Sequence, residues 1–142
     1  MRRNTIVVLL LCLALVMAFA VSAAWAGSPH FVGSVEFTFD SADNTITATG
    51  KEAGLGGESQ VHIVLSATAS CINPGDRHPR AENKQDLSAE GDFPVQNGKA
   101  DFELSVTPSF QPDCTPPMSV IFTNVKVTDE TNGITQSFSG PF

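Results

Sequence analysis

Apolar residues occupy every odd-numbered position between Gln60 and Cys71, namely Val61, Ile63, Leu65, Ala67, Ala69 and Cys71. The even-numbered positions are polar except for Val64. Because successive side chains of a β-strand point to opposite faces of a sheet, this pattern predicts a strand with one buried face. Cys71 shares the phase of the apolar residues, so its side chain should lie in or beside the core.

Turn-forming residues after Phe39 predict a hairpin with a two-residue loop at Ala42-Asp43. This loop would pair Phe39 with Ile46 and Phe37 with Ala48. Both pairs then lie on one apolar face, which makes the hairpin self-consistent.

Asn97-Gly98 is the strongest hairpin signal in the chain, because both residues tolerate the positive φ of a type I′ turn. The turn would pair Phe93 with Phe102 and Val95 with Ala100. The apolar faces match again, so we predict a second hairpin here.

A third turn signal, Asn132-Gly133, follows an apolar run, Met118–Val127, that is typical of a buried strand. A two-residue turn would lead this strand into Ile134–Phe138. Val127 would then face Phe138.

These segments amount to about seven short strands, with turn signals about every ten residues and no helical periodicity. They predict an all-β fold, an antiparallel immunoglobulin-like β-sandwich in one domain over residues 27–142. A small barrel is the alternative. The core tryptophan of antibody domains is absent, so the likeness is one of architecture.

Residues 1–26 have the layout of a secretory signal peptide preceding this domain. Arg2 and Arg3 supply positive charge, an uncharged apolar run extends from Ile6 to Val21, and Ala24-Trp25-Ala26 fits the peptidase site. The rival is an uncleaved membrane anchor, which needs about 20 apolar residues. We expect cleavage after the last alanine and a location outside the cytoplasm, whether secreted, envelope-associated or periplasmic.

Cleavage would leave 116 residues with 6 basic and 15 acidic side chains, a net charge of −9. Such a charge repels nucleic acid and anionic lipid, so we expect neither as a partner and no membrane insertion after cleavage. The only tryptophan, Trp25, would be lost, and the chain has no tyrosine. This argues against a conventional carbohydrate-binding module, which stacks such rings on sugars.

Three cysteines would become two, because Cys12 lies in the apolar run of the signal. In an oxidising compartment the remaining pair has one connectivity, so we predict a Cys71–Cys114 disulfide. Such a bond should stabilise the folded protein by roughly 4 kcal/mol, because it lowers the entropy of the unfolded chain. Cys114 belongs to a proline-rich loop, Pro108–Pro117.

Cys71-Ile72-Asn73-Pro74-Gly75, the Asn97-Gly98 hairpin and Cys114 together resemble a group of small exported bacterial β-sandwich proteins with a C-x-N-P-G segment and a second downstream cysteine. The resemblance covers most of residues 50–127 and implies a secreted sandwich with a disulfide. It brings no catalytic residues. Where similar chains often have a second glycine after Asn-Pro-Gly, this one has Asp76.

The residue pattern offers no constellation for catalysis. The histidines are His30, His62 and His78, no G-x-S-x-G motif is present, and the cysteines are expected to be oxidised. His62 should lie on the solvent side of its strand. No spacing suggests zinc. We expect no enzyme, cofactor or metal.

The turns 40–44 and 129–132 each carry three Asp, Glu or Asn residues. Calcium takes such hard oxygen ligands. The same residue types are ordinary in turns because they hydrogen-bond their own backbone, and turn chemistry alone explains them.

One loop, residues 73–85, concentrates three of the six basic side chains of an otherwise acidic chain. Loops on a rigid sandwich often carry recognition, and arginine suits contact with carboxylate or phosphate. The candidate contact residues are Asn73, Arg77, His78, Arg80 and Lys84. The alternative is that these charges only solvate the loop and pair with its acidic residues.

We therefore expect a secreted, non-enzymatic binding or structural domain whose partner is another protein or an envelope component. The first alternative is a small secreted inhibitor or effector that uses Pro108–Pro117 as a rigid insert. The second is a hydrolase whose site leaves no signal in the sequence.

Overall fold

The computed structural model describes residues 27–74 and 83–141, so the predicted signal peptide lies outside the described residues. The described chain forms eight strands. They are β1 (His30–Phe31), β2 (Glu36–Asp40), β3 (Thr45–Ala53), β4 (Gln60–Ile72), β5 (Lys84–Pro94), β6 (Lys99–Val106), β7 (Ser119–Asp129) and β8 (Ile134–Phe138).

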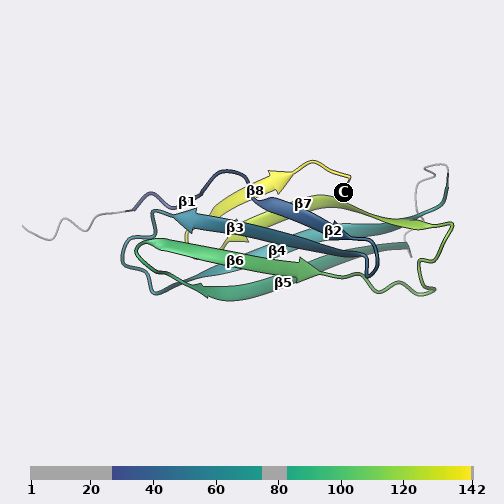
Figure 1. The fold of residues 1–142 in the computed structure, drawn as a ribbon, viewed down its shortest axis with the longest axis horizontal. Helices are drawn as coiled ribbons and strands as arrows, with labels where there is room; N and C mark the ends of the chain where they lie inside the picture. Colours follow the sequence, from purple (N-terminus) through teal and green to yellow (C-terminus); the bar gives the residue numbers. More distant parts are fainter. Residues whose placement is uncertain (1–26, 75–82, 142) are drawn as a thin grey trace, which may run out of the picture.

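The strands form two antiparallel sheets that stack as a sandwich (Figure 1). In the first sheet, β3 lies between β6 on one side and both β1 and β2 on the other. The second sheet has the order β5-β4-β7-β8. This order resembles that of immunoglobulin constant-type domains. The difference is that β5, which corresponds to the fourth strand of such a domain, lies in the second sheet and not in the first. The predicted all-β sandwich is confirmed.

The central strand β4 has the burial that its alternation predicts, because all its odd-numbered apolar residues are buried. It pairs with β5 on one side and with β7 on the other. The first hairpin is also confirmed, since Phe39 lies opposite Ile46 and Phe37 opposite Ala48.

The Asn97-Gly98 turn forms, but its two strands part at once. Gln96 and Lys99 bridge the turn, after which β5 pairs with β4 while β6 pairs with β3 in the other sheet. The predicted backbone pairing of Phe93 with Phe102, and of Val95 with Ala100, is therefore wrong. The two rings still meet in the core, with centroids 6.0 Å apart. This turn joins the two sheets.

The last hairpin is displaced by two residues from its predicted register. Phe138 lies opposite Val125, not opposite Val127. The turn contains four residues, 130–133, and the Asp129 carboxylate supports it by accepting a hydrogen bond from the Thr131 amide at 2.8 Å. A shift of two residues keeps every side chain on its predicted face.

β7 changes phase at a β-bulge. Its buried apolar residues stand at even positions before the bulge and at odd positions after it: Val120, Phe122, Val125 and Val127. The register of β7 against β4 shifts at the same point. Asn124 lies there with a φ of 53°, a left-handed conformation that asparagine tolerates better than most residues.

Cys71 and Cys114 form the predicted disulfide, with their Cα atoms 5.8 Å apart. The bond joins the end of β4 to the segment between β6 and β7, where Phe110 is also buried. The sulfur of Met118 lies 3.8 Å from Cys71 Sγ. The disulfide therefore secures one end of the sandwich.

Gly50 of β3 leaves room for the ring of Phe102, its partner on β6. A Cβ at position 50 would lie 2.4 Å from the Cζ of that ring. Gly50→Ala must displace the ring from its edge contacts with Phe31 and Phe93. We expect urea denaturation to show a loss of about 1–3 kcal/mol in the free energy of unfolding.

Gly57→Ala is the matched control, because no atom of residues 27–74 or 83–141 lies within 4 Å of its Cβ position. This substitution should change the free energy of unfolding by less than about 0.5 kcal/mol. Equal effects of the two substitutions would contradict the tight contact at Gly50.

Candidate functional site

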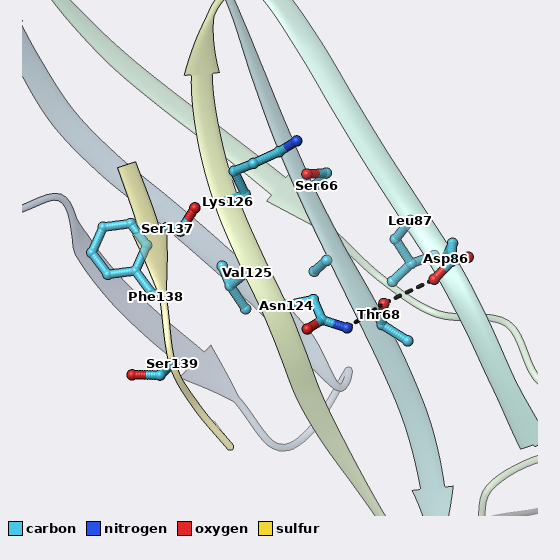
Figure 2. Close-up of a pocket in the computed structure, with 11 residues that line it drawn as sticks. Ser66, Thr68, Asp86, Leu87, Asn124, Val125, Lys126, Ser137, Phe138 and Ser139 are labelled. Atoms are coloured by element: carbon cyan, nitrogen blue, oxygen red, sulfur yellow. Dashed lines mark hydrogen bonds between the residues drawn. The ribbon is translucent and has the colours of Figure 1, made fainter. Parts of the chain in front are cut away.

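A polar depression of about 650 Å³ lies at the bulge, and all four strands of the second sheet line it (Figure 2). We call it the groove. Its polar lining residues are Ser66, Thr68, Asp86, Asn124, Lys126, Ser137 and Ser139. Its apolar lining residues are Ala67, Leu87, Val125 and Phe138.

A chain of hydrogen bonds crosses the groove and orients three of its side chains. Asn124 Nδ2 donates to Thr68 Oγ1 at 3.4 Å, and Thr68 Oγ1 donates to Asp86 Oδ1 at 2.8 Å (Figure 2). Asp86 supplies a negative charge and Lys126 a positive one. The groove therefore presents a charged acceptor and a charged donor on a hydrogen-bonded sheet.

Alternation and the bulge together build this surface. Ser66 and Thr68 point away from the core because they alternate with the buried residues of β4. The bulge places Asn124 beside Thr68 by adding a residue to β7. The groove was not predicted from the sequence, although the change of apolar phase between Phe122 and Val125 was a signal for the bulge.

Most of the predicted contact loop lies outside the described residues. Asn73 is exposed just after β4, as a loop residue should be. Lys84 instead lies within β5, opposite Ser70, so its predicted place in a loop is wrong. β5 begins there because residues 84–94 alternate in burial and complete a ladder with β4. Arg77, His78 and Arg80 lie outside the described residues.

His62 lies on the solvent side of β4, as predicted. Its Nδ1 is 2.9 Å from Asp92 Oδ1, and its Nε2 is 3.8 Å from Glu90 Oε2. The hydrogen bond to Asp92 is the main cause that raises the pKa of His62, and neighbouring negative charges add to it. These contacts link β4 to β5 at the surface.

The carboxylates of the acidic turns are used locally. Asp40 Oδ1 accepts from the Ala42 amide and Asp129 Oδ1 from the Thr131 amide, both at 2.8 Å. These are the bonds that turn chemistry predicts. Within residues 27–74 and 83–141, no three His, Cys, Asp or Glu side chains are grouped so as to hold a metal ion.

Glu52 of β3 and Asp129 of β7 form a buried pair of carboxyls that was not predicted from the sequence. Burial, followed by the contact with Asp129, raises the pKa of Glu52 from 4.5 to about 8. Glu52 is therefore mostly protonated at neutral pH. Its even number was a signal, because Ile46 and Ala48 share that phase on β3 and are buried.

In the part of the chain that the structure describes, no helix has the length and apolar character needed to span a membrane. Comparisons with protein-family models, with curated proteins and with solved structures found no match to this chain. The fold and these sites define a small all-β protein with a Cys71–Cys114 disulfide and a polar groove on its second sheet.

Proposed function

We propose that this chain is a non-enzymatic domain, secreted or held in the cell envelope, that binds a protein or an envelope component through the groove. The observation that carries the proposal is the orientation of Asp86 by Thr68 and Asn124, in a groove that the positively charged Lys126 also lines. Side chains that are already ordered lose less entropy when a partner binds. The disulfide supports an oxidising compartment.

Binding is tested by titrating the purified protein against isolated envelopes and against medium from the source cells. Asp86→Asn and Lys126→Gln each remove one charge with little change of shape. Each should raise the Kd about tenfold or more, because each weakens a hydrogen bond to a charged group.

Asp101→Asn is the matched control, since Asp101 forms a surface ion pair with Lys51 on the other sheet, at 3.0 Å. It should leave binding unchanged. Wild-type binding by both groove variants would reject the groove as the contact surface. Absence of any partner in both fractions would reject the binding function.

A second candidate is a small secreted inhibitor or effector that inserts the loop Pro108–Pro117 into a target. Burial of Phe110 and the disulfide at Cys114 anchor this loop at two points, while Pro112, Asp113 and Pro116 are exposed. A complex with a soluble target in the medium, weakened by Asp113→Ala and not by Asp86→Asn, would favour this candidate. Retention with the cells would favour the envelope component.

A further inference from the structure

β3 and β7 belong to different sheets and finish at the same end of the sandwich (Figure 1). Glu52, near the end of β3, and Asp129, the last residue of β7, both stand at buried positions of their strands. Both residues are 0% exposed. Asp129 is satisfied, because Oδ1 accepts from the Thr131 amide at 2.8 Å and Oδ2 from Asn132 Nδ2 at 2.7 Å. In contrast, neither carboxyl oxygen of Glu52 receives a hydrogen bond from a donor in the described residues.

Within the described part of the chain, the two ionisable groups that act on Glu52 are both acidic. Asp129 faces it from β7, and Glu58 acts on it from the turn that follows β3. Asn132 Nδ2 bridges these two neighbours, since it also donates to Glu58 Oε2 at 3.1 Å. The partners of Glu52 on β1 and β6 are uncharged. An ionised Glu52 would therefore be a buried negative charge beside like charges, which is a costly arrangement.

We propose that Glu52 and Asp129 hold one proton between them, that this proton latches the two sheets together at this end of the sandwich, and that mildly alkaline pH releases the latch. The proton makes Glu52 a donor, and Asp129 is the acceptor in contact with it. Two carboxyls that share a site commonly keep one proton because both cannot ionise at low cost. The latch connects β3 to β7 and does not use the groove.

The direction of the pH dependence follows from the two states of Glu52. Its carboxyl has a pKa near 4.5 in the unfolded chain and about 8 in the folded one. Between these values the folded protein holds a proton that the unfolded chain has lost, so stability falls as pH rises and levels off above about 8. In this window the unfolding equilibrium constant increases by up to about tenfold per pH unit.

His62 contributes with the same sign. Its pKa is also raised on folding, so its stabilising contribution is present below the ordinary histidine pKa and is lost as pH rises through the folded value. The contribution of Glu52 must therefore be isolated by substitution.

Urea denaturation of the wild-type protein and Glu52→Gln at pH 5 to 9, followed by circular dichroism, makes this separation. The glutamine cannot ionise, so the variant should lose most of the pH dependence and be more stable than wild type at pH 9. Glu103→Gln is the control, because Glu103 is an exposed carboxylate on β6 and should leave the slope unchanged. If the free energy of unfolding of Glu52→Gln fell with pH as steeply as that of the wild-type protein, the proposal would be overturned.

A nuclear magnetic resonance titration of ¹³C-labelled glutamate carboxyls reads the proton directly and does not depend on the folding of a glutamine variant at position 52. One glutamate carboxyl should titrate near pH 8. Glu58→Gln should lower that midpoint, because it removes a negative neighbour of Glu52. If every glutamate in the wild-type protein has titrated by pH 6, the proposal is wrong.

Discussion

Reduction of the Cys71–Cys114 disulfide is expected to lower the free energy of unfolding by about 4 kcal/mol. The bond closes a loop with a sequence separation of 43, and its loss returns the corresponding freedom to the unfolded chain. For a domain of this size the Tm should fall by roughly 15 °C. Far-ultraviolet circular dichroism is the suitable probe, because tyrosine is absent and Trp25 lies in the predicted signal peptide.

The double variant Cys71→Ala with Cys114→Ala is the control for this measurement. It should be as unstable as the reduced protein and insensitive to reductant. An unchanged Tm in reduced protein whose two thiols are both labelled after unfolding would contradict a stabilising role for the disulfide.

Phe122→Ala should have an effect of similar size, a loss of about 3–5 kcal/mol in the free energy of unfolding. Phe122 is 0% exposed on β7 and lies opposite Ala69 in the neighbouring strand. The alanine removes a ring from the middle of the core, where neighbouring side chains close the resulting cavity only in part. Equilibrium urea denaturation at constant pH measures the loss.

Phe39→Ala is the matched comparison. The Phe39 ring contacts Phe122 edge-on with centroids 5.9 Å apart, but the residue is 40% exposed on an edge strand. Less apolar surface is buried there, so its loss should be less than half that of Phe122→Ala. Equal losses in the free energy of unfolding would contradict this expectation, because the two rings differ in burial.

The elements of the fold were predictable where one local pattern decides them. Alternation along β4 defined its buried face, and the turn after Phe39 placed the first hairpin in register. The Asn97-Gly98 turn was also predicted correctly, but the pairing of its two strands was not. β5 pairs with β4 in one sheet, and β6 pairs with β3 in the other. Such long-range pairing leaves no signal in the turn itself.

The candidate site was much less predictable than the fold. Its residues are ordinary polar residues of strand surfaces, and Asp86 and Asn124 meet at Thr68 only because β4 separates their strands and β7 carries a bulge. The pattern on β3 does place Glu52 inward. Its protonation, however, depends on Asp129, which is distant in sequence and reaches it from the opposite sheet.

The position of the disulfide also determines how the domain would carry tension. β2 and β8 run along the long axis of the sandwich (Figure 1), and a pull along a strand strains all its ladder hydrogen bonds together, because they lie perpendicular to it. A force that pulls the chain taut passes from Cys71 to Cys114 through the covalent bond. β5 and β6 lie between these cysteines in the sequence, so the force is not transmitted through them. Asp86 of the groove is on β5 and therefore lies on a strand that bears none of this force.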